Sequence, residues 1–406
     1  MAKFGLLGKT LKHSFSPQIH KLLGGYDYDL IEKDETDLKD FVKSGEYDGI
    51  NITIPYKKEI IKYLDAVDEK AQIIGAVNTV VKEKGKLLGY NTDWFGMEYA
   101  LKKAQICLAN KKVLILGSGG TSNTAKFVAN HLGAREVLIV SRSGEINYQN
   151  CYEQKDAEII INTTPVGMYP NNYESAIDLT KFARLEGVFD AIYNPDTTYL
   201  TFCASELGVK NANGLAMLVA QAKMASELFT KTTISDHLID KAVENIKKQT
   251  RNIVLIGMAG VGKSTIANEL SQKLSMPFVD TDSIIEQREN KKISDIFAQN
   301  GEEYFRKVES QVLMEVGKQT GKIIATGGGI VERKENKFYL KQNGVVFNLV
   351  GDLEKLDRKN RPLSTDIDAV KELFRRRKDK YLDFSDYTID NNCELKQTID
   401  KIMEKL

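Results

Sequence analysis

The chain has few cysteines, prolines and tryptophans. Its 406 residues include 4 Cys, 7 Pro and 1 Trp. The N-terminal letters MAKFGLLG lead into an apolar stretch without the pattern of a signal peptide. The cysteines are widely spaced and form no Cys-x-x-Cys pair, so we expect reduced thiols in the cytoplasm. They are Cys107, Cys151, Cys203 and Cys393.

A charge excess and long apolar runs are missing too. The 57 Lys and Arg nearly balance the 56 Asp and Glu, which leaves no general electrostatic case for nucleic acid or acidic membranes as partners. No apolar run approaches the roughly 20 residues that a membrane span requires. We therefore expect small-molecule partners, no nucleic acid and no membrane. The sequence leaves the oligomeric state open.

What the chain does have is length and a regular alternation. With 406 residues it exceeds what one hydrophobic core usually organises, so we expect two or three domains. Short apolar runs alternate with helical patterns, beginning FGLLG, SPQIHKLLGG, YDYDLIEK and TDLKDFVKSG. This alternation predicts βαβ units with mainly parallel sheets, and hence an α/β fold.

The segment IVLIGMAGVGKSTIA, residues 253–267, places an apolar strand before a glycine loop that opens a helix at Lys263. Such a loop directs backbone N–H groups toward phosphate. In its GxxxxGKS spacing, Lys263 reaches the outer phosphates and the Ser264 hydroxyl is placed for Mg²⁺. The residues expected to contact the nucleotide are Gly257, Ala259, Gly260, Val261, Gly262, Lys263, Ser264 and Thr265.

Two aspartates follow this loop in MPFVDTDSIIE. We interpret the segment as a strand, whose period of two places Asp280 and Asp282 on the same side. One aspartate can then serve the metal and the other an acceptor hydroxyl. A solvated strand end is the alternative interpretation.

Four further motifs follow in order: GEEYFRKVE, ATGGGIV, NRPLS and RRRKDKY. With them, residues 250–406 resemble shikimate kinase, a member of the nucleoside monophosphate kinase-like P-loop group. The resemblance implies that Asp282 binds the substrate hydroxyls and accepts a proton, and that Asp280 lies near Mg²⁺. It also implies that Arg306 and Arg377 bind the substrate carboxylate and that Arg361 belongs to a lid over the ATP phosphates. A glycine turn formed by Gly327, Gly328 and Gly329 would lie beside the substrate ring.

A second glycine loop, LILGSGGTS at 114–122, has a strand before it and a helix after it. Ser122 stands where the dinucleotide-binding fingerprint usually has its third glycine. The next strand ends in an arginine instead of an acidic residue, which favours a 2′-phosphate and therefore NADP(H); a solvated arginine is the alternative. The expected cofactor-binding residues are Gly117, Ser118, Gly119, Gly120, Thr121, Ser141, Arg142 and Ser143.

The motifs HSFSP, NITIPYK, GAVNTV and GYNTD precede that loop, and NTTPVGM, FDAIYNP and NGLAMLVAQA follow it. Together they resemble shikimate dehydrogenase over residues 1 to about 240. The resemblance implies that Lys57 and Asp93 form the catalytic pair. It also implies that Ser14 and Ser16 bind the substrate carboxylate and that Tyr193 contacts the substrate. The residues expected to bond the ring hydroxyls are Asn51, Thr53, Asn78 and Gln221.

Hydride transfer to a ring carbon requires a proton at the oxygen, and a positioned ammonium can supply or relay it. A carboxylate beside Lys57 would keep the ammonium charged and oriented. The sequence leaves open which of Lys57 and Asp93 moves the proton.

The two resemblances together imply a bifunctional enzyme of aromatic amino acid biosynthesis. NADPH would reduce 3-dehydroshikimate to shikimate, and ATP with Mg²⁺ would phosphorylate the 3-hydroxyl. One alternative is a quinate/shikimate dehydrogenase of broader specificity joined to a related small-molecule kinase; another is a chain with one half retained as a scaffold.

The implied architecture has an α/β substrate domain, a Rossmann-like NADP domain and a P-loop nucleoside monophosphate kinase-like α/β domain. The expected bounds are residues 1–100 with the returning helix 213–235, then 101–212, a linker helix 236–250, and 251–406.

Overall fold

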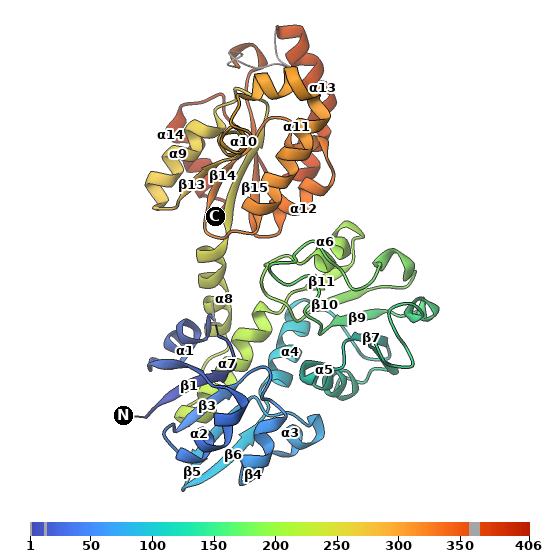
Figure 1. Ribbon diagram of the computed structural model, residues 1–406, viewed down its shortest axis with the longest axis vertical. Helices are drawn as coiled ribbons and strands as arrows, with labels where there is room; N and C mark the ends of the chain where they lie inside the picture. Colours follow the sequence, from blue (N-terminus) through green and yellow to red (C-terminus); the bar gives the residue numbers. More distant parts are fainter. Residues whose placement is uncertain (1, 12–13, 357–365) are drawn as a thin grey trace. The chain divides into compact units, whose positions relative to one another are not determined.

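The computed structural model describes residues 2–11, 14–356 and 366–406. The chain divides into two compact units, Met1–Ile246 and Lys247–Leu406, named here the first and second unit. Both units combine helices with sheets that contain parallel strands, so the predicted α/β class is confirmed (Figure 1).

The first sheet of the first unit has the strand order β2-β1-β3-β5-β6-β4. β1 pairs in parallel with β2 and β3, whereas β5 is antiparallel to both β3 and β6, so this sheet is mixed. Lys84 and Gly85 both have positive φ (50° and 79°), as a tight turn between β5 and β6 requires. The strands are β1 (Phe4–Gly8), β2 (Tyr28–Glu32), β3 (Gly49–Ile52), β4 (Ala66–Val67), β5 (Thr79–Glu83) and β6 (Lys86–Tyr90). The helices beside them are α1 (Ser16–Gly24), α2 (Leu38–Ser44) and α3 (Glu69–Ile74).

The second sheet is parallel throughout, in the order β11-β10-β9-β7-β8. Strand β7, which lies between β9 and β8, reads KVLIL and is buried at every position, because helices cover both faces of a parallel sheet. The strands are β7 (Lys112–Leu116), β8 (Glu136–Val140), β9 (Ile159–Asn162), β10 (Gly187–Asp190) and β11 (Lys210–Ala212). The associated helices are α4 (Asp93–Lys103), α5 (Gly120–His131) and α6 (Tyr199–Glu206).

Helix α7 (Leu215–Thr230) joins the two sheets. Phe229 packs with Phe4 of the first sheet, whereas Met217 shares a core with Met97 of α4 and the strands of the second sheet. The two helices approach so closely that a Cβ on Gly96 would lie 2.5 Å from the Met217 carbonyl oxygen. A glycine is therefore needed where α4 crosses α7.

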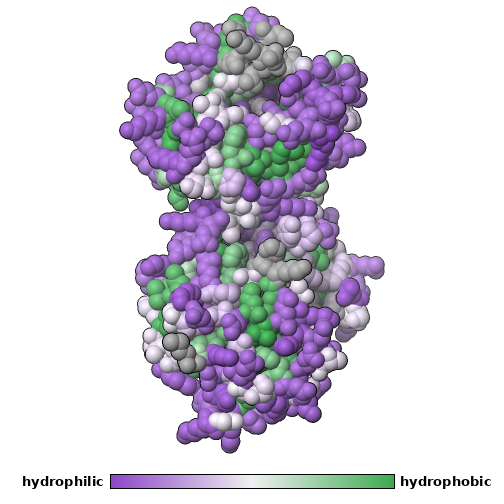
Figure 2. Space-filling view, turned by 60° about the vertical axis from the view of Figure 1, so that its left-hand side comes forward, coloured by the Kyte–Doolittle hydropathy of each residue, from purple (hydrophilic) through white to green (hydrophobic). Residues whose placement is uncertain are grey.

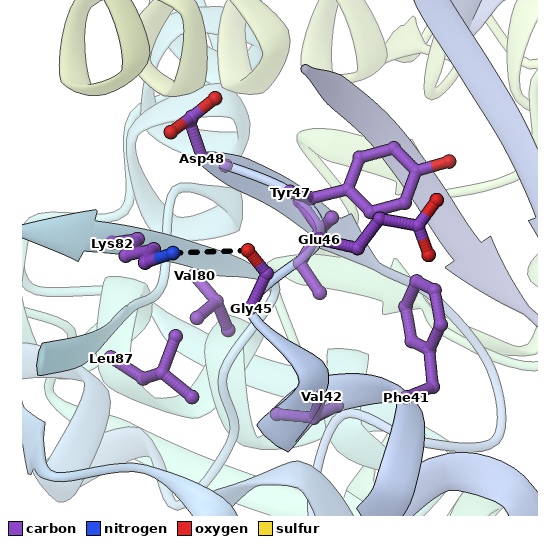
Figure 3. Close-up of a pocket in the computed structure, with 11 residues that line it drawn as sticks. Phe41, Val42, Gly45, Glu46, Tyr47, Asp48, Val80, Lys82 and Leu87 are labelled. Carbon is purple, nitrogen blue, oxygen red and sulfur yellow. Dashed lines mark hydrogen bonds between the residues drawn. The ribbon is translucent and has the colours of Figure 1, made fainter. Parts of the chain in front are cut away.

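A small hollow opens between α2 and strands β3 and β5 of the first sheet (Figure 3). The Lys82 ammonium crosses it and donates a hydrogen bond of 3.0 Å to the Gly45 carbonyl oxygen. Gly45 is the C-cap of α2, so this contact satisfies one of the helix-end carbonyls. We interpret the hollow as a structural feature of the helix–sheet contact.

The second unit has one parallel sheet in the order β13-β14-β12-β15-β16. Figure 1 shows α9 and α14 on one side of it and α11 and α12 on the other. The strands are β12 (Asn252–Gly257), β13 (Phe278–Asp280), β14 (Ile323–Ala325), β15 (Gly344–Val350) and β16 (Tyr387–Asp390). The helices are α9 (Lys263–Leu274), α10 (Thr281–Glu289), α11 (Ile293–Gly317), α12 (Glu335–Lys341), α13 (Ile367–Phe384) and α14 (Leu395–Met403). Helix α8 (His237–Thr250) precedes them and crosses the boundary between the units.

The expectation that Asp280 and Asp282 lie on one extended strand is wrong. β13 ends at Asp280, which is the N-cap of α10, and Asp282 lies in the first turn of that helix. The Asp280 carboxylate accepts hydrogen bonds from the backbone N–H groups of Asp282 (3.0 Å) and Ser283 (3.3 Å). Aspartate is a strong N-cap, so the helix start prevails over the strand period.

Within the described part of the chain, no helix combines the length and the apolar character that crossing a membrane requires. On the face shown in Figure 2, hydrophilic residues predominate and the hydrophobic ones form separate patches. All four cysteines are free.

We predict that Gly96→Ala destabilises the first unit by about 1–3 kcal/mol, because the added methyl group overpacks the contact between α4 and α7. Urea unfolding followed by the fluorescence of Trp94, the only tryptophan, measures this unit. Gly120→Ala is the control, since a Cβ there meets nothing within 4 Å. Equal stability of the two variants would contradict the packing argument.

Candidate active sites

A pocket in the first unit gathers residues from the first sheet, from segments that follow strands of the second sheet and from α7. It brings together every substrate-binding and catalytic residue predicted for the N-terminal half of the chain, although those residues are spread over more than 200 positions. They are Ser14, Ser16, Asn51, Thr53, Lys57, Asn78, Asp93, Tyr193 and Gln221, and Thr121 of the glycine loop lines the same pocket.

Lys57 and Asp93 form an ion pair in this pocket, with 2.7 Å between Nζ and Oδ2. Their side chains are 18% and 8% exposed, so the pair is largely withdrawn from water. Asp93 is the first residue of α4, and its backbone N–H donates to the Asn91 side-chain oxygen (3.0 Å). The helix start therefore places the carboxylate, and the carboxylate places the ammonium.

Asn78 holds this pair in place. Its amide nitrogen donates to the second Asp93 oxygen and to the Thr92 hydroxyl, both at 2.9 Å, and lies 3.3 Å from Oε1 of Gln221. Its amide oxygen accepts from the Thr92 backbone N–H at 2.6 Å. Asn78 thus ties the start of α4 to α7, which fixes Asp93 and Gln221 relative to each other.

Asn51 is oriented by a network that sequence reasoning missed. The Tyr28 hydroxyl donates to its Oδ1 (2.6 Å), and its Nδ2 donates to the Thr79 hydroxyl (2.9 Å). The His20 ring stacks on Tyr28 with 3.9 Å between centroids. Burial lowers the pKa of His20 to about 3, an effect that a hydrogen bond to Asn51 partly offsets. No local motif marks Tyr28 or His20, because their contacts with Asn51 span more than 20 residues.

The glycine loop of the first unit lies at the carboxyl end of β7 and opens α5. Gly117 has φ +109°, and its N–H donates to the Val140 carbonyl (2.8 Å), which joins the loop to the end of β8. A Cβ on Gly119 or Gly120 would meet nothing within 4 Å, so the loop leaves open space at a helix N-terminus. These features fit the diphosphate of a dinucleotide. The other predicted cofactor residues lie in this loop or just after β8: Ser118, Thr121, Ser141, and the exposed Arg142 and Ser143.

The P-loop of the second unit lies between β12 and α9. Gly257, Gly260 and Gly262 have positive φ (134°, 85° and 96°), which side chains rarely tolerate. The Lys263 ammonium donates to the carbonyls of Gly257 (2.8 Å) and Met258 (2.9 Å). Ala259 and Val261 lie in the same loop, and Thr265 lies in the first turn of α9.

The Ser264 hydroxyl donates to the Asp280 carboxylate at 2.7 Å. This brings together two oxygen ligands of the kind that Mg²⁺ prefers beside nucleotide phosphates. The described residues contain no group of three or more His, Cys, Asp or Glu that could hold a metal ion. The Ser264 and Asp280 oxygens fit a Mg²⁺ that also binds phosphate oxygens and water.

The triple-glycine turn draws the remaining predicted residues together. A Cβ on Gly327 would lie 2.7 Å from Oδ1 of Asp282, and one on Gly328 would lie 2.7 Å from the P-loop nitrogen of Ala259. A Cβ on Gly329 would overlap the guanidinium of Arg306. The turn therefore has no room for side chains, because the P-loop, α10 and α11 meet there.

Arg377 also reaches this turn, with Nη1 donating to the Gly328 carbonyl at 3.2 Å. Arg361, the predicted lid residue, lies outside the described residues.

Three residues of the second unit that contact the predicted site residues were not foreseen: Glu309, Glu332 and Tyr381. Glu309 is fully buried and pairs with Arg306 at 2.8 Å. Burial raises its pKa, although Arg306 partly offsets the effect. The spacing of Arg306 and Glu309 by three residues on a helix is a signal that could have indicated their pairing. The Tyr381 hydroxyl donates to the Gly328 carbonyl, and Glu332 binds Arg377.

Comparison with known proteins places both regions in families. The family model described as Shikimate dehydrogenase substrate binding domain matches residues 6–80. Over 251 residues the chain is 41% identical to the shikimate dehydrogenase (NADP(+)) of Caldicellulosiruptor bescii, covering 55% of this chain and 87% of that protein. The chain belongs to the shikimate dehydrogenase family. A second family model, described as Shikimate kinase, matches residues 259–406, so the dehydrogenase region is followed by a shikimate kinase domain and both resemblances are confirmed.

Other relatives support the membership of the shikimate dehydrogenase family. The shikimate dehydrogenase (NADP(+)) of Methanococcus maripaludis is 38% identical over 267 residues, which cover 59% of this chain and 96% of that protein. Among solved structures, a chorismate mutase/shikimate 5-dehydrogenase fusion from Clostridium acetobutylicum has a TM-score of 0.59 at 35% identity, covering 61% of this chain and 98% of that one. The Thermus thermophilus shikimate 5-dehydrogenase, solved with NADP(H) and shikimate, has a TM-score of 0.55 at 29% identity, covering 60% and 99%.

We predict that His20 makes the dehydrogenase region less stable at mildly acidic pH. Its pKa in the folded chain, about 3, lies below the ordinary 6.5, so the unfolded chain takes up the proton first. The contribution of neutral His20 to the free energy of unfolding is complete above pH 6.5 and is lost as pH falls toward 3. Between pH 7.5 and 5 we expect a loss of about 2 kcal/mol from this group.

Urea unfolding at both pH values, followed by Trp94 fluorescence, measures this loss. His20→Asn should lose less stability than the wild-type chain over the same interval, and the exposed His131→Asn should match the wild type. If all three proteins lost the same free energy of unfolding, His20 would not be a buried neutral group.

Proposed function

We propose that this chain catalyses two consecutive reactions. The first unit reduces 3-dehydroshikimate to shikimate with NADPH, and the second unit phosphorylates the 3-hydroxyl of shikimate with ATP and Mg²⁺. The observation that carries the first assignment is the ion pair of 2.7 Å between Lys57 and Asp93 in a pocket lined by hydroxyl and amide groups. The second rests on the meeting of the P-loop, Asp282 and the glycine turn.

In the first unit, NADPH held at the glycine loop supplies the hydride. The Lys57–Asp93 pair provides the proton that the ketone oxygen takes up as it becomes a hydroxyl. Because both side chains are largely buried, the attraction between the ammonium and the carboxylate is only weakly screened by solvent. The ion pair therefore holds the Lys57 ammonium in one orientation, with a proton directed into the pocket.

The substrate carboxylate is assigned to Ser14 and Ser16. Ser16 is the first residue of α1, where the partial positive charge of a helix N-terminus favours an anion. Asn51, Thr53, Asn78 and Gln221 are assigned to the ring hydroxyls, and Tyr193 to a contact with the substrate or the nicotinamide. All five residues line the pocket.

In the second unit, ATP with Mg²⁺ held at the P-loop supplies the phosphoryl group. Asp282 accepts the proton of the attacking hydroxyl, and Lys263 and Ser264 contact the phosphates and the metal. Arg306 and Arg377 hold the substrate carboxylate, since guanidinium groups bind carboxylates through paired hydrogen bonds. The glycine turn lets the backbone approach the ring.

We also propose the roles of the chain segments. Residues 1–100 with 213–235 bind the substrate of the dehydrogenase, 101–212 bind NADP(H), 236–250 connect the two units, and 251–406 form the kinase. The pocket lining supports the first assignment, because α7 contributes Gln221 to it. The four free cysteines support a cytoplasmic location.

We predict that Lys57→Ala lowers the kcat of NADPH oxidation with 3-dehydroshikimate by about 10²–10⁴-fold, because the positioned proton donor is lost. ATP consumption with shikimate should be unchanged. Both rates are measured on the full chain, and the neighbouring exposed Lys58→Ala is the control. Unchanged NADPH oxidation in the Lys57 variant would refute the assigned role. The reverse reaction, in which shikimate or quinate reduces NADP⁺ or NAD⁺, distinguishes a broader specificity.

We predict the opposite pattern for Lys263→Ala. Loss of the ammonium that contacts the outer phosphates should lower the kcat of ATP-dependent phosphorylation of shikimate by about 10²–10³-fold and leave NADPH oxidation intact. Lys273→Ala, which alters an exposed lysine on the same helix, is the control. Loss of both activities in a folded Lys263 variant would mean that the two sites are not independent.

A further inference from the structure

The glycine turn of the kinase site continues into a short 3-10 helix, η5 (Ile330–Glu332). Its last residue, Glu332, lies against α13, and its Oε1 accepts a hydrogen bond from Nε of Arg377 at 2.7 Å. Lys380 binds the other carboxylate oxygen, and Arg376 approaches the first at 3.5 Å. The side chains of Glu332 and Arg377 are 13% and 4% exposed. A largely buried acid thus lies directly beside an arginine assigned to a substrate carboxylate.

The hydrogen bonds of Arg377 leave one part of its guanidinium available. Nε is used by Glu332, and Nη1 donates one hydrogen to the Gly328 carbonyl (3.2 Å). Nη2 is buried and has no hydrogen-bond partner among the described residues. A buried cationic N–H group without a partner is costly, so this atom indicates where a ligand oxygen binds.

A guanidinium can bind a carboxylate through its side, formed by Nε and Nη2, or through its end, formed by Nη1 and Nη2. Glu332 occupies Nε and thereby closes the side. We propose, on the basis of the kinase function proposed above, that Glu332 is a positioning residue that turns Arg377 so that the substrate carboxylate meets the Nη1–Nη2 end.

The charge of Glu332 is compatible with this role. Burial alone would raise the pKa of its carboxyl group, but hydrogen bonds and charges from Lys380 and Arg377 outweigh burial and lower the pKa to about 2. Glu332 therefore stays ionised at any assay pH. Lys380 and Arg376 surround its charge, which limits its repulsion of the substrate anion.

The test is steady-state kinetics of ATP-dependent phosphorylation by full-length Glu332→Ala and Glu332→Gln, with shikimate and with shikimate methyl ester as acceptors. With shikimate, we expect Glu332→Ala to raise KM roughly tenfold and Glu332→Gln to raise it less, because the amide still accepts a hydrogen bond. The kcat and the KM for ATP should stay within about twofold of the wild-type values. With the ester, which lacks the carboxylate charge, the variants should match the wild type.

Glu335→Gln is the matched control, since this carboxylate begins α12 and lies 3.6 Å from Arg333, away from Arg377. NADPH oxidation by the same preparations reports that the first unit is folded, and an unchanged KM for ATP reports that the second unit is folded. An unchanged KM for shikimate in both Glu332 variants would overturn the inference. So would an equal loss with shikimate and with its ester, which would show a purely structural role. If the wild-type chain transferred no phosphoryl group to shikimate, the proposed function itself would fail, and this inference with it.

Discussion

Taking a charged carboxylate out of water is costly unless a cation or several hydrogen bonds compensate it. This constraint governs both sites of the chain. Asp93 is paired with Lys57, Glu309 with Arg306 and Glu332 with Arg377. In each pair the cation is also a residue assigned to the substrate or to proton transfer. The interactions that make burial of the acids tolerable therefore also orient the functional groups.

The position of the sites follows from the parallel strands. Loops that leave neighbouring parallel strands on the same side meet at their carboxyl ends, which is where open α/β sheets bind ligands. In the first unit the loop after β7 is joined there to the end of β8. In the second unit the P-loop follows β12, Asp280 ends β13, and the glycine turn comes just after β14. Sheet order thus brings together motifs that are far apart in the sequence.

Several parts of this arrangement could be predicted from local sequence. The helices that begin at Asp93 and Lys263 follow from apolar spacing and from the glycine loop, because both signals act over a few residues. The prediction of a strand through Asp282 failed because Asp280 caps a helix. Both the strand pattern and the capping signal act over a few residues, and the capping signal prevailed. Tyr28 and Glu332 could not be predicted, because their roles depend on contacts made across the fold.

The two families, the two phosphate-binding loops and most candidate residues could be recognised in the amino-acid sequence, since each of these is encoded in a short run of letters. The fold was needed to show that Glu332 neutralises Arg377 and that the expected pair of Lys57 and Asp93 is in direct contact. Lys57 lies 36 residues from Asp93, and Glu332 lies 45 residues from Arg377. Over such separations the distance between two charges is set by the packing of strands and helices, and burial then determines which of the many acids must be paired.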